Sequence, residues 1–318
     1  MTDRLLRLLG LLLILTAVAI ALSRAPDRPV QTLVARWAQP PSAFILVKGQ
    51  LVHLRDEGPR NDPAPVLLLH GTGASLHTWE GWAAALKTAR RVIRIDLPGF
   101  GLSGPFEGQY TPDDYRGDTY ARFVLDVLDV LKVPRAVIGG NSLGGEVAWR
   151  AVTLAPKRFD RLILVDASGY DFAPEDIPLG LRIARLSPLN RIGEHLLPRA
   201  VITASLHSVY GDPTQVSDEL VDRYFELTLR EGNRRALGLR LQQLEMGRDA
   251  ARIKTLALPT LVLWGGRDRL IPPAIGARFA ADIRGATLVR FDSLGHVPQE
   301  EDPARSVAAV IGFLEHAP

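Results

Sequence analysis

The sequence of 318 residues contains no cysteine and only two methionines. The lack of cysteine excludes disulfides, cysteine nucleophiles and iron–sulfur clusters, but it leaves the cellular compartment open. The seven histidines show no zinc-ligand spacing, so we expect neither a metal site nor another cofactor. There is also little excess charge. The formal net charge is +3 and the basic residues are scattered, which makes nucleic acid a poor candidate as a partner.

The overall composition is that of an ordinary globular protein. Hydrophobic residues make up 47% of the chain and charged residues 23%. This proportion provides enough apolar material for a sizeable core. The length indicates one large domain, or one domain that carries an insertion.

An apolar run stands at the N-terminus. Arg4 and Arg7 precede the uncharged residues 8–22, and small residues lie near the end of that run. This order is typical of an export signal. Residues 5–22 approach the ~20 residues of a membrane span if Arg7 snorkels. We therefore expect residues 1–23 to be a signal peptide or a membrane anchor. Either would place the protein at the membrane or on its extracytoplasmic side. Residues 24–42, rich in proline and arginine, are predicted as a linker.

Short apolar runs alternate with helical patterns along the rest of the chain. We predict strands at residues 44–47, 51–54, 66–69, 91–95, 136–138, 162–165, 260–264 and 287–291. We predict helices at residues 114–131, 143–154 and 305–314. This alternation indicates an α/β fold, with a mostly parallel sheet covered by helices on both faces, over residues 43–169 and 253–318.

Residues 170–252 break this alternation. They contain no clear strand signal and several helical pieces separated by prolines, so we predict a helical cap or lid inserted into the sheet domain. The insertion is rich in apolar residues, including Leu179, Leu181, Ile183, Leu186, Leu189, Ile192, Leu196 and Leu197. These side chains either line a pocket beneath the lid or form the lid's own core.

The pattern Gly140-x-Ser142-x-Gly144 lies between a predicted strand and a predicted helix. A serine on such a sharp turn projects its hydroxyl above the sheet, at the positive end of the helix dipole. Taken alone the pattern is weak, because glycine and serine are common in turns.

Three further polar segments each follow a predicted strand. They contain Thr72 in His70-Gly-Thr72, Asp268 in Trp-Gly-Gly-Arg-Asp268, and His296 in Leu-Gly-His296. The carboxyl ends of the strands are where an open α/β sheet holds its ligand. The polar residues are therefore expected to meet at one edge of the sheet.

Together these segments resemble the α/β-hydrolase family, from about residue 44 to residue 314, with the chain order serine, aspartate, histidine. The resemblance implies that Ser142 is the nucleophile, that His296 is the general base and then the acid, and that Asp268 orients His296. It also implies that the backbone N–H groups of Thr72 and Leu143 bind the oxyanion.

One carboxylate competes with Asp268. Asp166 follows the strand at residues 162–165, and some members of the family use a carboxylate at that place. We favour Asp268, because Trp-Gly-x-x-Asp before Ile-Pro matches the usual acid loop.

Four other residues are expected to support the site. We predict that two residues line a substrate pocket. Asn141 lies in the strand-to-helix turn that carries Ser142, called the elbow below, and Trp79 follows the turn that contains Thr72, called the oxyanion turn. A place in the core is the alternative for Trp79. His70 is expected to organise the oxyanion turn, and Asp96 to cap a turn beside two glycines.

The residue at the nucleophile position limits the classes of hydrolase that the chain resembles. A serine there separates the chain from relatives with an aspartate nucleophile, namely haloalkane dehalogenases and epoxide hydrolases. Gly-Asn-Ser-Leu-Gly-Gly is similar to the elbow of meta-cleavage-product hydrolases, which split a C–C bond. Those enzymes usually carry tryptophan after the histidine, where this chain has Val297, and they are cytoplasmic.

These two departures favour an exported esterase that acts on a small apolar acyl or aromatic ester. A C–C bond hydrolase is the alternative. A non-catalytic, membrane-tethered binding protein of the same fold is the alternative from another class.

Overall fold

The computed structural model describes residues 2–185 and 196–315. An eight-stranded sheet runs through its body in the order β1-β2-β4-β3-β5-β6-β7-β8. The β1–β2 and β2–β4 pairs are antiparallel, and all other neighbouring strands are parallel. The strands are β1 (Ser42–Val47), β2 (Gln50–Glu57), β3 (Val66–Leu69), β4 (Val92–Ile95), β5 (Ala136–Asn141), β6 (Phe159–Val165), β7 (Thr260–Gly265) and β8 (Thr287–Phe291). The mostly parallel sheet is confirmed, with one strand for each predicted run.

The central strands have continuous apolar sequences, which favours their burial in the middle of the sheet. Every residue of β3, β4, β5 and β7 is buried, as is typical of parallel strands with both faces covered. The first two strands form a hairpin instead. Lys48 and Gly49 take positive φ angles of 52° and 87° between them, which turns the chain back sharply.

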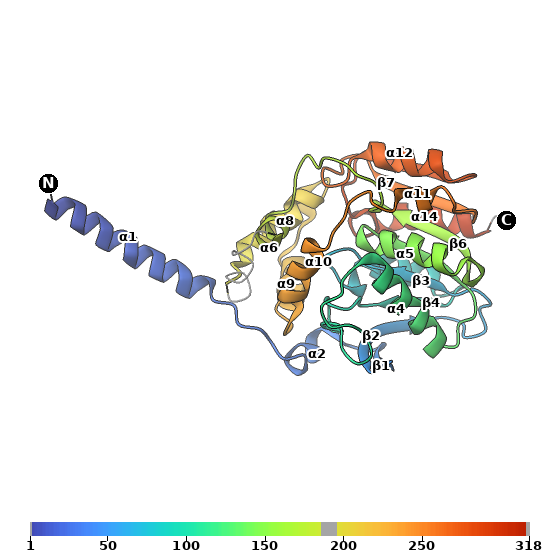
Figure 1. Ribbon diagram of the computed structural model, residues 1–318, viewed down its shortest axis with the longest axis horizontal. Helices are drawn as coiled ribbons and strands as arrows, with labels where there is room; N and C mark the ends of the chain where they lie inside the picture. Colours follow the sequence, from blue (N-terminus) through green and yellow to red (C-terminus); the bar gives the residue numbers. More distant parts are fainter. Residues whose placement is uncertain (1, 186–195, 316–318) are drawn as a thin grey trace.

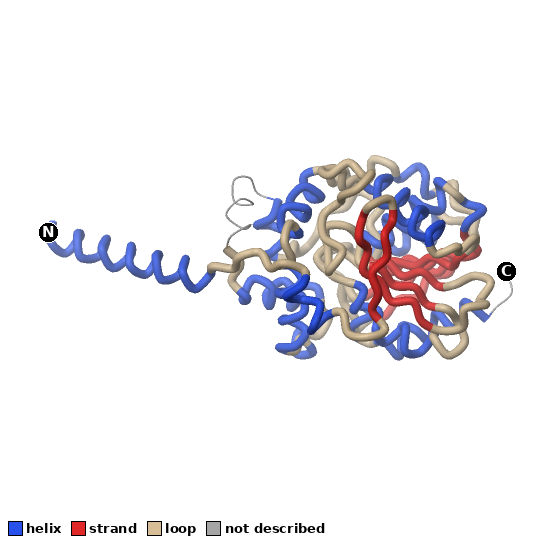
Figure 2. The backbone as a smooth tube through the Cα atoms, turned by 90° about the horizontal axis from the view of Figure 1, so that it is seen from below, coloured by secondary structure: helices blue, strands red, loops and turns tan. Residues whose placement is uncertain are grey.

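Helices cover both faces of the sheet (Figure 2). One face packs against α4 (Gly117–Val130), α5 (Leu143–Leu154) and α12 (Pro273–Asp282), whose apolar sides join one buried cluster. The other face packs against α3 (Glu80–Leu86) and α14 (Pro303–Glu315). Each large apolar side chain buried in these layers contributes ~1.5–3 kcal/mol to folding.

Three short helical segments complete the sheet domain: η1 (Leu76–Trp79), η2 (Pro156–Arg158) and α13 (Pro298–Glu301). A fourth, η3 (Pro213–Gln215), lies in the segment between β6 and β7. The indole Nε1 of Trp82 in α3 donates to Ser306 Oγ of α14 at 2.8 Å, which joins the two helices of one layer.

Between β6 and β7 the described residues form helices and no strand. These are α6 (Leu179–Arg185), α8 (Arg199–Val209), α9 (Asp218–Thr228), α10 (Asn233–Gln242) and α11 (Ala250–Ile253). Figure 1 shows α6, α8, α9 and α10 on one side of the body, between α1 and the sheet. The action of this insertion as a lid stays a prediction. Three of its apolar residues, Leu186, Leu189 and Ile192, lie outside the described residues.

The N-terminal helix α1 (Thr2–Ser23) projects from the body (Figure 1). The leucines at positions 5 to 15 of this helix are exposed, for example Leu6 at 65% and Leu13 at 70%. Arg4 and Arg7 lie in the same helix and interrupt its apolar character. Among the residues that the structure describes, no helix is both long and apolar enough to cross a membrane. The role of residues 1–23 as a signal peptide or a membrane anchor stays a prediction.

The segment 24–42, predicted as a linker, instead folds onto the body. It contains α2 (Gln31–Trp37), whose Leu33 and Trp37 are buried in a small cluster with Leu102 and Leu227. Leu33 and Trp37 stand four residues apart and so share one face of the helix. The high content of proline and arginine had suggested an exposed segment, but these two side chains provide enough apolar surface for docking.

Candidate active site

Ser142 sits on the turn from β5 into α5 with φ 54° and ψ −114°. A non-glycine residue in such a conformation costs ~1–3 kcal/mol and persists only where the surroundings enforce it. The enforcing feature is close packing of the backbone. A Cβ on Gly140 would lie 2.2 Å from the carbonyl carbon of Gly144, and one on Gly144 would lie 2.1 Å from the carbonyl oxygen of Leu69. Glycine is therefore required on both sides of the serine.

A histidine–aspartate pair lies near this turn. His296 Nδ1 is 2.7 Å from Asp268 Oδ2, and both side chains are buried. The second oxygen, Asp268 Oδ1, accepts from the backbone N–H groups of Leu270 and Ile271 at 2.8 and 2.9 Å. With both oxygens engaged, the carboxylate has one orientation. The backbone N–H of His296 donates to the carbonyl oxygen of Val209 at 2.7 Å, which ties the histidine to the end of α8.

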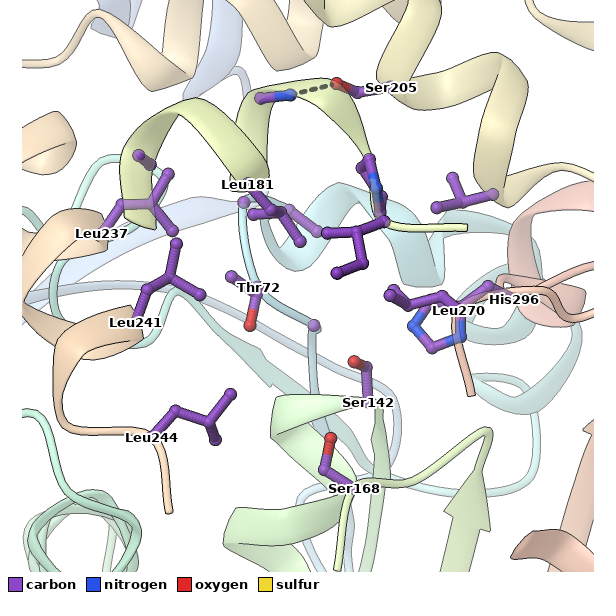
Figure 3. A pocket seen from close by; sticks show the side chains of 18 of the residues that line it. Thr72, Ser142, Ser168, Leu181, Ser205, Leu237, Leu241, Leu244, Leu270 and His296 are labelled. Carbon is purple, nitrogen blue, oxygen red and sulfur yellow. Dashed lines mark hydrogen bonds between the residues drawn. The ribbon is translucent and has the colours of Figure 1, made fainter. Parts of the chain in front are cut away.

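A cavity of about 330 Å³ opens above the elbow. The Ser142 hydroxyl points into it, with His296 at one side and Thr72 at another (Figure 3). Its remaining walls are largely apolar and come mainly from the insertion: Leu181, Ile183, Leu196, Leu197, Val201, Ile202, Leu206, Leu237, Leu241, Leu244, Leu270, Ile271 and Val297. The cavity can therefore hold an apolar group next to the serine.

The residues predicted to bind the oxyanion flank Ser142. Leu143 is the first residue of α5, and the first N–H groups of a helix have no intrahelical acceptor. Thr72 lines the cavity. Its turn lies against the elbow, since a Cβ on Gly71 would be 3.2 Å from Ser142 Cβ. The oxyanion role of the two N–H groups stays a prediction.

The two predicted pocket residues separate in the structure. Asn141 lines the cavity, but its amide donates to the carbonyl oxygens of Val165 and His296 at 3.2 and 2.9 Å, so it ties the elbow to the histidine loop. Trp79 does not line the cavity. Its side chain is fully buried in the opposite layer, 4.8 Å from Trp82 between ring centroids. The pocket prediction for Trp79 is corrected, because η1 turns its ring away from the cavity.

Asp166, the competing carboxylate, does not hold the histidine Nδ1. Asp166 is fully buried at the end of β6, and its Oδ1 accepts from the backbone N–H of Gly265 at 2.9 Å. Burial raises the pKa of Asp166 well above its usual range, and the charge of Asp268 acts in the same direction. Of the two carboxyl groups, Asp268 is the one that bonds His296 Nδ1.

One group of side chains in the described part of the chain has the spacing of a cation site. A ligand atom from each of Asp166, Asp268 and His296 lies within 4.8 Å of the others. However, His296 Nδ1 and both oxygens of Asp268 are already engaged in hydrogen bonds. The group is therefore held together by hydrogen bonds among its own members and to backbone N–H groups.

Two kinds of cavity residue were missed from the sequence. Glu146 and Arg150 border the cavity one and two turns along α5 from the serine, where the spacing of four residues was the available signal. Leu237, Leu241 and Leu244 form a wall from α10 and the residues after it (Figure 3). Their spacing indicates one face of a helix, but it does not say what that face contacts.

Comparisons with known proteins agree with this arrangement. A family model described as alpha/beta hydrolase fold matches residues 64–303. The 2-hydroxymuconate semialdehyde hydrolase of Pseudomonas sp. (strain CF600) is 29% identical over 283 residues, which are 86% of this chain and 93% of that protein. The structure of a meta-cleavage product hydrolase from Pseudomonas fluorescens IP01 has a TM-score of 0.73 at 26% identity, covering 86% of this chain and 97% of its own.

A second solved structure, described as a membrane phospholipase A, has a TM-score of 0.71 at 23% identity and covers 99% of this chain and 98% of its own. This likeness is one of fold alone. The family model spans most of the sequence and includes the elbow and Asp268 and His296. The chain therefore belongs to the α/β-hydrolase fold family and is a hydrolase of that fold.

Proposed function

We propose that this hydrolase cleaves carboxylic esters that carry an apolar acyl or aromatic group, through an acyl-enzyme formed on Ser142. The observation that carries the proposal is that the elbow combines a strained serine, a neighbouring histidine and an apolar cavity. A strained serine projects into a largely apolar cavity of about 330 Å³ that His296 also borders. An apolar group placed there gains ~25 cal/mol for each Å² of surface removed from water.

The first half of the reaction acylates the serine. Asp268 keeps the proton on His296 Nδ1, so Nε2 is left to take the proton of the Ser142 hydroxyl as Oγ attacks the ester carbonyl. The N–H groups of Thr72 and Leu143 bind the oxyanion, and one such donor is worth ~3–4 kcal/mol. The intermediate then expels the alcohol, which receives the proton from His296.

The second half releases the acid. His296 takes a proton from a water molecule as the water oxygen attacks the acyl group on Ser142. When the intermediate collapses, the proton returns to the serine oxygen and the carboxylic acid leaves. Asp268 orients the imidazole and balances its charge in both halves.

A second candidate function is hydrolysis of a C–C bond. The relative named 2-hydroxymuconate semialdehyde hydrolase supports it. A muconate-type substrate carries a carboxylate, for which arginine is the usual partner. Three arginines line the cavity. Arg150 is bonded to Glu146 and two aspartates and Arg234 to Asp27, whereas Arg185 is exposed. We place ester hydrolysis first because the cavity around Ser142 is largely apolar.

We further propose that α1 directs the protein out of the cytoplasm, either as a cleaved export signal or as a segment retained on the membrane surface. The exposed leucines of this helix support the idea. Intact mass of the protein isolated from cells, with vesicle flotation, tests it. We expect a mature N-terminus near Ala21, or flotation of the full chain. A full-length chain that neither floats nor leaves the cytoplasm would contradict the proposal.

A substrate panel with the full chain tests the ester proposal. We expect p-nitrophenyl esters to be turned over faster than a chromogenic dienol of the meta-cleavage type. Faster processing of the dienol would favour the C–C bond hydrolase. A protein with no turnover, and no labelling of Ser142 by a fluorophosphonate, would instead be a binding protein of this fold.

A further inference from the structure

A second carboxyl group lies behind the histidine–aspartate pair. Asp166 follows β6, is fully buried and has a φ of 43°, in the left-handed region that non-glycine residues rarely adopt. Its Oδ1 accepts from the N–H of Gly265 at 2.9 Å. Its Oδ2 is buried, and in the part of the chain that the structure describes no N–H or O–H group donates to it. A buried oxygen in this state needs an explanation.

The neighbour of Asp166 supplies that explanation. Oxygen atoms of Asp166 and Asp268 lie within 4.8 Å of each other and of a His296 nitrogen, and the two carboxyl groups are within hydrogen-bonding reach. Two ionised carboxylates at this distance repel strongly in a buried site, so one of the pair holds a proton.

The hydrogen-bond donors decide which group carries the proton. Asp268 accepts from three N–H groups, those of Leu270, Ile271 and His296. Among the described residues, one N–H group, that of Gly265, donates to Asp166. Because N–H donors stabilise the charged form of a carboxyl group, the proton belongs on Asp166.

A third acidic group faces the pair from α13. Glu301 accepts from the N–H groups of Gly295 and Gly211 at 2.7 and 2.8 Å. Its charge raises the pKa of Asp166 less than burial and Asp268 do, and burial also raises the pKa of Glu301 itself. Burial, Asp268 and Glu301 therefore favour the neutral form of Asp166, against the N–H donor of Gly265, which favours the charged form.

We propose that Asp166 is a neutral carboxylic acid whose O–H donates a hydrogen bond to Asp268 and so positions that carboxylate against His296. It is a positioning residue, and the proposal rests on the proposed Ser142–His296 chemistry. It has a second consequence. Removal of Asp268 removes the charge that keeps Asp166 neutral, and Asp166 already lies within 4.8 Å of a His296 nitrogen. Asp166 is therefore a reserve partner for His296.

A matched pair of variants tests the neutral state. In Asp166→Asn the amide N–H₂ can donate to Asp268 while the C=O accepts from Gly265, and no charge changes. We expect kcat within about threefold of wild type and an unmoved acidic limb of the kcat/KM pH profile. In Asp166→Ala the donor is lost, and we expect kcat to fall at least about tenfold with KM unchanged.

The opposite charge state makes a different prediction for the same variants. If Asp166 were ionised, Asp166→Asn would remove a charge that stabilises protonated His296. Its kcat would then fall as far as that of Asp166→Ala, and its acidic limb would move to lower pH. Either result, in a variant that keeps the wild-type unfolding temperature, overturns the proposal.

The reserve role is tested by combining variants. Asp166→Asn is expected to cost at most about threefold alone, but at least about tenfold in kcat in an Asp268→Ala background. An equal effect in both backgrounds would remove the reserve role.

An infrared measurement separates this proposal from the proposed function. We expect the carbonyl band of a protonated carboxyl group in the wild-type protein at neutral pH, and its loss in Asp166→Asn. The absence of such a band would overturn the neutral state whether or not the protein turns over esters. Absence of turnover by the wild type, with the band present, would refute the ester proposal alone.

Discussion

Two buried histidine–aspartate pairs in the described part of the chain have the same separation between the histidine Nδ1 and the aspartate Oδ2. The Nδ1–Oδ2 distance is 2.7 Å both between His296 and Asp268 and between His53 and Asp96. A serine even lies beside the second pair, with Ser42 Oγ 2.9 Å from His53 Nε2. Distances among a serine, a histidine and an aspartate therefore do not by themselves define a catalytic site.

The surroundings of the two pairs differ. Ser42 lies in the regular strand β1, and its hydroxyl also accepts from Arg55 Nε at 2.9 Å. His53 and Asp96 are fully buried, and neither lines the cavity above the elbow. Ser142 instead points into that cavity from a strained turn at the start of a helix. We infer that a reactive serine differs from a structural one in two ways: a ligand can reach it, and N–H donors lie near it.

The largest expected difference concerns the two serines. Ser142→Ala removes the proposed nucleophile, so we expect kcat for a p-nitrophenyl ester to fall at least about a thousandfold without loss of fold. Ser42→Ala is expected to keep kcat within about threefold. Steady-state kinetics with thermal unfolding measure both effects. Activity close to that of wild type in Ser142→Ala would break the distinction.

The two histidines should differ in their effect on activity. His296→Asn is expected to lower kcat at least about a thousandfold. It also leaves the buried Asp268 without its partner, so we expect a loss of ~3 kcal/mol in the free energy of unfolding. His53→Asn leaves the buried Asp96 without its partner, so we expect a loss of ~3 kcal/mol in stability and little change in kcat. Denaturant unfolding and ester turnover on the same samples measure both. A His53→Asn variant that is stable but inactive would contradict the account.

The proximity of Ser142, Asp268 and His296 could be predicted from the sequence because it depends on local sequence features. The strained turn requires glycine at fixed places beside Ser142, and Asp268 and His296 each follow an apolar strand. The sequence signal for the pair of His53 and Asp96 is weaker. Asp96 was expected to cap a turn, and it does accept from the N–H of Leu102. Its bond to His53 joins residues on two strands and could not be predicted from local pattern.

The remaining differences arise from tertiary packing. Trp79 stands close to the oxyanion turn in sequence, but proximity does not say which layer its ring enters. Residues 24–42 have the composition of a linker, yet Leu33 and Trp37 dock on the body. In the insertion, apolar spacing predicts helices but does not identify the side that faces the cavity.

The buried residues around His53 should also make the stability of the protein depend on pH. The ring centroid of His77 lies 6.1 Å from that of His53, and burial lowers the pKa of His77 to about 3. An unfolded histidine titrates near ~6.5. The neutral His77 therefore stabilises the fold fully above that pH, and this contribution is lost as pH falls toward 3.

Denaturant unfolding across this range measures the effect. We expect the wild type to lose stability more steeply with acid than His77→Gln, while ester turnover of the two at neutral pH agrees within about twofold. Equal slopes would contradict a neutral, buried His77.

The smallest expected effect concerns the cavity wall. Leu241→Ala removes an apolar wall opposite the elbow, so we expect preference for longer acyl chains to rise by about two- to fivefold in kcat/KM. Leu46→Ala, at an exposed leucine of β1, is the matched control and should leave the preference unchanged. Measuring kcat/KM for p-nitrophenyl esters of increasing acyl length gives this preference. Equal preferences in the two variants would show that this wall of the insertion does not select the substrate.

Labelling of the full chain with a fluorophosphonate, followed by peptide mass spectrometry, tests the central claim most directly. The account predicts one adduct, on the peptide that contains Ser142, and its loss in Ser142→Ala. An adduct on the peptide that contains Ser42, or continued ester turnover with Ser142 unlabelled, would contradict it.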